Sequence, residues 1–123
     1  MGSKKVLLVE DHPATQQMFQ MALEGAGFEV RAASNGMRLI KYVRDWHPAA
    51  VVMEVMMPWV DGFELCRTIR ATDEIKDTPV ILVTAKSSPD DRQKAKQVGA
   101  TEFLEKPVEI KALIETVTRY AGA

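Results

Sequence analysis

Three short, unbroken apolar runs constrain the fold of this chain most strongly. Residues 6–9, 50–53 and 80–83 are apolar throughout, rich in β-branched side chains and about one strand long. Strands without polar alternation are typical of parallel sheets that are covered by helices on both faces. We therefore expect these three runs to be central strands of a parallel sheet.

Two further strands and five helices complete the predicted pattern. Residues 28–32 alternate between apolar and polar, which favours a more exposed edge strand, and residues 101–104 form a short fifth candidate. Helical apolar stripes lie between the strands, within residues 14–22, 39–46, 65–69, 89–98 and 110–117. Strict alternation of strand and helix implies right-handed crossovers, with helices on both faces of a doubly wound α/β sheet.

The ends of the helices are marked by residues with capping preferences. Pro13 and Pro89 suit the first helical position, and Gly27 and Gly99 suit the position just after a helix. The predicted N-caps are Asn35, Asp61 and Ser88. The helix near residues 89–98 has the fewest apolar residues to bury, so we expect it to be the loosest.

Length and composition indicate one domain and exclude several classes of protein. A chain of 123 residues, 46% hydrophobic and 27% charged, fits a single globular domain over residues 1–123, with residues 1–3 as a leader or simple start. Its net charge of -1 gives no positive field for nucleic acid or an anionic membrane. Since every apolar run is far shorter than a membrane span, we expect a soluble, cytoplasmic protein.

Cysteine and histidine are too few for a zinc site of the usual kind. The chain has one cysteine and two histidines, so a metal ion would have to be held by oxygen ligands. Cys66 lies on the apolar stripe of the third helix, and we expect a buried structural thiol there rather than a reactive one.

Polar residues follow the predicted strands at the points where the strands end. Glu10 and Asp11 follow the first strand, and the third, fourth and fifth strands lead to Glu54, Thr84 and Lys106. Because parallel strands end at one edge of the sheet, three carboxylates, a hydroxyl and an ammonium should meet there. Carboxylates in this number favour Mg²⁺. Alternatively, each acid caps the helix that follows it, as Asp11 could do for the helix near Pro13.

Four motifs make the chain resemble the receiver domain of two-component response regulators over nearly its whole length. They are VLLVEDHP at residues 6–13, VMMPWVDG at 55–62, VTA at 83–85 and GATEFLEKP at 99–107. The resemblance implies a flavodoxin-like, five-stranded sheet of order 2-1-3-4-5 with a phosphoacceptor aspartate at the end of the third strand. It also implies a histidine kinase or phosphotransfer protein as donor, a requirement for Mg²⁺, and a signalling module rather than an enzyme.

The same resemblance implies a role for each matching residue. Glu54 stands at the phosphoacceptor position. The implied Mg²⁺ ligands are Asp11 directly, Glu10 largely through water, Glu54, and the backbone carbonyl of Met56. Thr84 and Lys106 would bind phosphoryl oxygens, and Phe103 would be the switch aromatic that moves with Thr84, or else a plain core residue. The bond before Pro107 is a candidate cis peptide.

Glu54 departs from the family pattern because the acceptor should be aspartate. The additional methylene pushes the carboxylate towards the place where a phosphoryl group would lie, and misplacement by 1 Å can cost ~100-fold in rate. Three interpretations stay open: a constitutive, phosphorylation-independent receiver, an inert pseudo-receiver used for docking, and an engineered or still phosphorylatable variant.

The expected partners are proteins. The fourth helix, fifth strand and fifth helix would present a surface to an effector or to a second copy of the chain. Trp59, where the family usually has a small residue, is either a lid or partner anchor, or folds back onto the surface. A phosphohydrolase is disfavoured because Met56 stands where its second carboxylate would be. A nucleotide binder is disfavoured because no glycine-rich loop follows the first strand.

Overall fold

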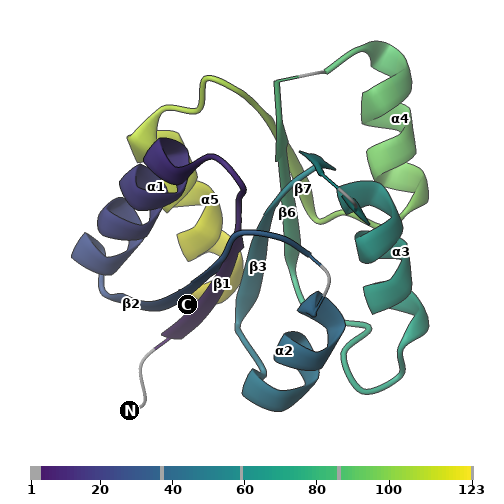
Figure 1. The fold of residues 1–123 in the computed structure, drawn as a ribbon, viewed down its shortest axis with the longest axis horizontal. Helices are drawn as coiled ribbons and strands as arrows, with labels where there is room; N and C mark the ends of the chain where they lie inside the picture. Colours follow the sequence, from purple (N-terminus) through teal and green to yellow (C-terminus); the bar gives the residue numbers. More distant parts are fainter. Residues whose placement is uncertain (1–3, 37, 59, 86, 123) are drawn as a thin grey trace.

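A five-stranded parallel sheet forms the centre of the computed structural model, which describes residues 4–36, 38–58, 60–85 and 87–122 (Figure 1). The strand order is β2-β1-β3-β6-β7, which is the predicted order 2-1-3-4-5 once two short additional strands are numbered. The strands are β1 (Lys4–Val9), β2 (Phe28–Ala33), β3 (Ala50–Glu54), β6 (Val80–Thr84) and β7 (Glu102–Glu105). The predicted fold class is confirmed, and all residues of β3 and β6 are buried, as their unbroken apolar sequences indicate.

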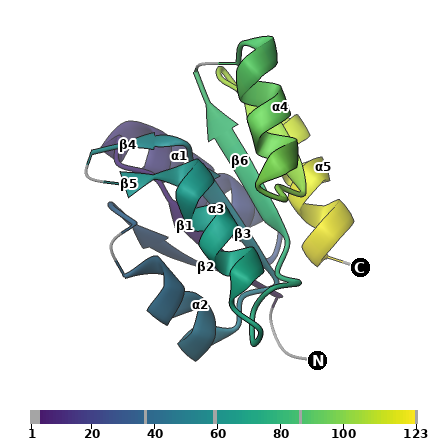
Figure 2. The same ribbon diagram turned by 90° about the vertical axis from the view of Figure 1, so that its right-hand side faces the viewer.

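Among the described residues, five helices cover the two faces of this sheet (Figures 1 and 2). They are α1 (Pro13–Gly25), α2 (Leu39–Trp46), α3 (Gly62–Ala71), α4 (Pro89–Gln97) and α5 (Ile110–Ala121). Helices α1 and α5 pack on one face, and α2, α3 and α4 pack on the other. Neighbouring residues of β1 point to opposite faces of the sheet: Leu7 packs in the core under α2 and α3, whereas Leu8 packs in the core under α1 and α5. Within the described ranges, none of the helices is both long and apolar enough to cross a membrane.

Most of the predicted helix ends are confirmed. Asp61 caps α3 by accepting a hydrogen bond from the backbone N–H of Phe63, and Ser88 forms a capping box with Asp91 at the start of α4. Gly27 and Gly99 have positive φ values of 100° and 86°, a region in which glycine is favoured. Helix α4 buries Ala95 alone within its own length, which agrees with its predicted weak packing.

The predicted N-cap at Asn35 is wrong. Helix α2 begins at Leu39, and its N-cap is Arg38. The chain first passes close to another segment: a Cβ atom on Gly36 would lie 2.5 Å from the side chain of Leu65. Asn35 therefore lies before the N-cap position of α2.

A small hairpin follows β3 and was not predicted. Strands β4 (Met56–Met57) and β5 (Val60–Asp61) pair antiparallel just before α3. Gly62 closes this turn against β3: its N–H donates to the carbonyl of Val55, and an added Cβ would lie 2.7 Å from the carbonyl oxygen of Glu54. The hairpin therefore brings apolar residues to the carboxyl edge of the sheet.

Candidate functional site

The strand-end residues meet at the carboxyl edge of the sheet. Glu54 and Thr84 are the last residues of the adjacent strands β3 and β6, and Glu10 and Lys106 directly follow β1 and β7. Together with Asp11 these residues line a cavity of about 370 Å³. The sheet topology therefore brings together all five residues that the sequence placed at strand ends.

Lys106 lies between two buried carboxylates. Its Nζ is 2.8 Å from Oε1 of Glu10 and 2.5 Å from Oε1 of Glu54. The side chains of Glu10 and Glu54 are only 2% and 7% exposed, and that of Lys106 is 21% exposed. Two negative charges thus share one positive charge in a site that is largely shielded from water.

The other oxygen of each carboxylate accepts a backbone hydrogen bond. The N–H of His12 donates to Oε2 of Glu10 at 3.1 Å, and the N–H of Met56 donates to Oε2 of Glu54 at 3.0 Å. Every carboxylate oxygen of this pair therefore has a partner within the protein. The backbone N–H of Lys106 donates to the carbonyl of Thr84, and the Lys106–Pro107 peptide bond is cis.

The carboxylates keep Lys106 charged. Burial disfavours the ammonium, but hydrogen bonds to Glu10 and Glu54, together with their charges, outweigh burial and raise the pKa of Lys106 above its usual value. The lysine is therefore a permanent cation at the strand ends.

The expected Mg²⁺ ligands are not arranged as a metal centre. Glu10 and Glu54 direct oxygens to Lys106, and Asp11 lines the cavity without joining them. Across the described ranges, three or more acidic, histidine or cysteine side chains are nowhere grouped so as to hold a metal ion. In this arrangement the carboxylate pair contacts the ammonium of Lys106. The alternative that Asp11 caps α1 is wrong, because the N-cap is His12 and no side chain supplies a capping bond.

Phe103 and Thr84, the predicted switch pair, lie in neighbouring strands. Thr84 is buried, whereas Phe103 is half-buried in β7 and packs at the margin of the core under α3 and α4. The Phe103 ring stacks on Phe63 with a centroid separation of 6.4 Å and an angle of 18°. The guanidinium of Arg92 lies 5.7 Å from the Phe103 ring.

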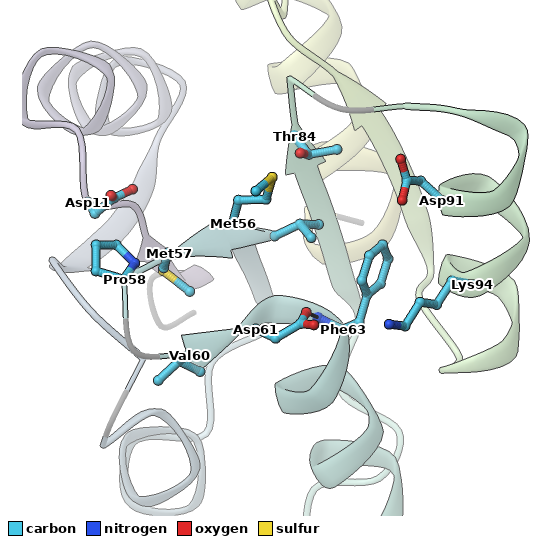
Figure 3. A pocket seen from close by; sticks show the side chains of 11 residues that line it. Asp11, Met56, Met57, Pro58, Val60, Asp61, Phe63, Thr84, Asp91 and Lys94 are labelled. Carbon is cyan, nitrogen blue, oxygen red and sulfur yellow. Dashed lines mark hydrogen bonds between the residues drawn. The ribbon is translucent and has the colours of Figure 1, made fainter.

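A larger cavity beside the strand-end site was missed by sequence reasoning. It measures about 800 Å³ and lies between the β4–β5 hairpin, the first turn of α3, and α4 (Figure 3). Apolar residues in a predicted loop, Met56, Met57 and Val60, were the available sign of it, and Met56 remains 55% exposed. Asp11, Met56 and Thr84 line both cavities.

Two remaining sequence predictions have different outcomes. Cys66 is buried, as predicted, and its S–H donates to the carbonyl of Val98 at 3.5 Å. Burial raises the pKa of the Cys66 thiol. Trp59, with its predicted alternatives, lies outside the described residues, as do residues 1–3.

Comparisons with known proteins identify relatives over almost the whole chain. A family model described as the response regulator receiver domain matches residues 6–118. The polar-differentiation response regulator DivK of Brucella anthropi is 30% identical over 119 residues, which cover 97% of each chain.

Two solved structures are also similar. Chemotaxis protein CheY4 of Vibrio cholerae has 33% identity and a TM-score of 0.90, covering 97% of this chain and 99% of its own. The receiver domain of sensor histidine kinase PA1611 from Pseudomonas aeruginosa has 28% identity and a TM-score of 0.89, covering 99% of this chain and 100% of its own. Its structure has a magnesium ion coordinated in the active site cleft.

Proposed function

Because this chain belongs to the family of response regulator receiver domains, we propose that it is a signalling receiver that works without phosphorylation. In this proposal Glu54 occupies the phosphoacceptor position and acts as a built-in substitute for the phosphorylated residue. The protein would act by presenting a surface to partner proteins and not by turning over a substrate.

The contact between Lys106 and Glu54 carries this proposal. Lysine in such a site stabilises phosphoryl oxygens through charge-assisted hydrogen bonds. Here the Glu54 carboxylate already lies 2.5 Å from the Lys106 ammonium. It supplies one negative charge where a phosphate carries about -1.5 to -2, so the substitute is partial.

The surroundings of Glu54 also disfavour phosphoryl transfer to it. A nucleophilic oxygen must reach within about 3–3.5 Å of phosphorus with correct alignment. One oxygen of Glu54 contacts Lys106, and the other accepts from the backbone N–H of Met56. Attack on a phosphoryl donor would require at least one of these contacts to be given up.

We infer that Mg²⁺ competes with Lys106 for this site and therefore binds weakly. Glu10 and Glu54 are the two buried acids at the strand ends, and both contact the ammonium. A divalent ion would have to displace Lys106 from them before the predicted ligands Glu10, Asp11, Glu54 and the Met56 carbonyl could gather.

We propose that the partner is a histidine kinase, a phosphotransfer protein or a downstream effector, and that an effector meets the face of α4, β7 and α5. This face contains a cavity of about 340 Å³, lined in part by Arg92 and Phe103. A second copy of the chain is the alternative occupant of the same face.

Treatment with acetyl phosphate and Mg²⁺ tests the proposal. The parent chain should gain no phosphoryl group by mass spectrometry, whereas Glu54→Asp should gain one, because Asp11, Thr84 and Lys106 are all retained. Glu54→Gln is the matched control, since it keeps the length of the side chain but removes the nucleophile. Modification of the parent at Glu54 would overturn the proposal. An unmodified Glu54→Asp protein would show that the length of residue 54 is not the cause.

A constitutive receiver is then distinguished from an inert one by partner binding. If Glu54 imitates the phosphorylated state, Glu54→Gln should weaken binding to the partner, because Lys106 loses a charged acceptor. Equal binding by the parent and Glu54→Gln would favour a docking module without a switch.

A further inference from the structure

The 800 Å³ groove between the hairpin and α4 has the dimensions of a binding site. Ligand sites in proteins commonly measure about 300–1,000 Å³. Its lining is mixed: Met57, Val60 and the ring of Phe63 form apolar parts of the wall (Figure 3), together with Val55, and charged side chains lie beside them. A ligand could therefore bury an apolar body there.

The charged residues around this groove are mostly acidic. Among its described lining residues, Asp11, Asp61 and Asp91 oppose the single ammonium of Lys94. The formal net charge of these four side chains is -2. The N-terminal ends of α3 and α4 each contribute about +0.5, so about one negative charge remains among these described side chains.

Two carboxylates of this groove, Asp61 and Asp91, each use one oxygen in a helix cap. The helix caps use Oδ1 of Asp61 and Oδ2 of Asp91, so the second oxygen of each carboxylate lies outside its cap. Lys94 is positioned over the aromatic ring of Phe63, with Nζ 5.1 Å from the centroid. Figure 3 shows the side chains of Lys94 and Asp91 directed from α4 towards Phe63.

We propose that this groove binds one lysine or arginine side chain of a partner protein, together with the apolar residues beside it. The residual negative charge selects a cation and repels phosphates, nucleotides and acidic peptides. The apolar walls select neighbours such as leucine or valine.

Two stacked aromatic rings connect the groove to the face of α4 and β7. Phe63 lines the groove and stacks on Phe103, which lines the smaller cavity on that face together with Arg92. A partner that displaces Lys94 from Phe63 would therefore disturb the environment of Phe103.

Three blocked tripeptides probe the groove in backbone amide NMR titrations. Leu-Arg-Leu should give saturable shifts of the amide signals of residues 55–57, 60–63 and 91–94, and smaller shifts at Phe103. Leu-Glu-Leu should bind about tenfold or more weakly, because it places like charges together. Gly-Arg-Gly should also bind about tenfold more weakly, because it lacks the apolar surface. Equal binding of the arginine and glutamate peptides, or shifts elsewhere on the molecule, would overturn the proposal.

Two variants with the same added charge complete the test. Val60→Arg places a cation within the groove and should abolish binding of Leu-Arg-Leu. Met21→Arg, on the exposed side of α1, changes the net charge equally and should leave binding unchanged. If Val60→Arg does not fold, Lys94→Met is the deciding variant. It removes the competing cation and should strengthen binding of Leu-Arg-Leu. Unchanged or weaker binding by Lys94→Met would contradict the proposal.

Discussion

At the scale of single residues, Lys106 joins parts of the chain that are far apart in sequence. It is 96 residues from Glu10, yet the two side chains form a 2.8 Å contact. Because Glu10 and Glu54 are both buried, the ammonium offsets a repulsion that water would screen only weakly. The same residue therefore connects the stability of the site with its proposed signalling state.

Replacing Lys106 with methionine should destabilise the protein. Breaking a fully buried ion pair costs about 3–5 kcal/mol, and the partial exposure of Lys106 reduces the expected loss to about 2–3 kcal/mol. Urea denaturation measures this change in the free energy of unfolding. Lys111→Met, at an exposed position of α5, should change it little. The additional replacement Glu54→Gln should recover part of the loss, and a Lys106→Met protein as stable as the parent would contradict the assigned pairing.

The thiol of Cys66 should react slowly while the protein is folded. Burial raises its pKa, so less thiolate is present at a given pH than in the unfolded chain. Alkylation by iodoacetamide at pH 9 should therefore be slow for the native protein and fast in urea. The stability that the buried neutral thiol contributes is fully present below the ordinary pKa of the thiol, and it falls as pH rises through the higher pKa of the folded state. Equal rates of alkylation with and without urea would contradict the prediction of a protected thiol.

At the scale of the secondary-structure elements, α4 is stabilised more by its capped N-terminus and by cation–ring contacts than by burial of apolar surface. It buries Ala95, whereas its Arg92 and Lys94 side chains lie over the rings of Phe103 and Phe63. Its N-terminus is fixed by the reciprocal hydrogen bonds between Ser88 and Asp91. An element held in this way can loosen without disruption of the central sheet.

Removal of the α4 cap should loosen that helix selectively. Ser88→Ala deletes the hydroxyl that accepts from the N–H of Asp91 and should cost about 1 kcal/mol. Hydrogen exchange should then accelerate at the amides of α4 more than at those of β3 or β6. Ser87→Ala, one position earlier, is the control. Uniform acceleration over all elements would indicate global destabilisation instead of a local role for the cap.

The elements differ in how well sequence predicts them, for physical reasons. β3 and β6 were predictable because burial on both faces requires continuous apolar runs. The β4–β5 hairpin was not, since two-residue strands are too short to show a period of two. Contact between Lys106 and Glu54 was expected, because the additional methylene directs Glu54 towards the phosphoryl position, and it is confirmed. The contact of Lys106 with Glu10 was beyond sequence, which placed these residues at one edge without giving the distances between them.

At the scale of the whole molecule, the parallel sheet makes the site and the stability of the fold interdependent. Four strands contribute polar residues to one edge, so a change of cation there acts on β1, β3 and β7 together. The ammonium of Lys106 contacts two carboxylates at this edge, and in our proposal a metal ion must compete with it. The thermal stability of the entire domain should therefore report which cation occupies the edge.

Added Mg²⁺ should stabilise Lys106→Met more than the parent protein. Binding at a concentration tenfold above Kd raises the free energy of unfolding by about 1.4 kcal/mol. In Lys106→Met the competing ammonium is gone and Asp11, Glu10 and Glu54 are free to gather around the ion, so Kd should fall. Thermal melts over a series of Mg²⁺ concentrations should show a larger rise in Tm for this variant. Addition of Asp11→Asn to it should remove the rise, and equal rises for parent and variant would mean that Lys106 does not compete with the metal.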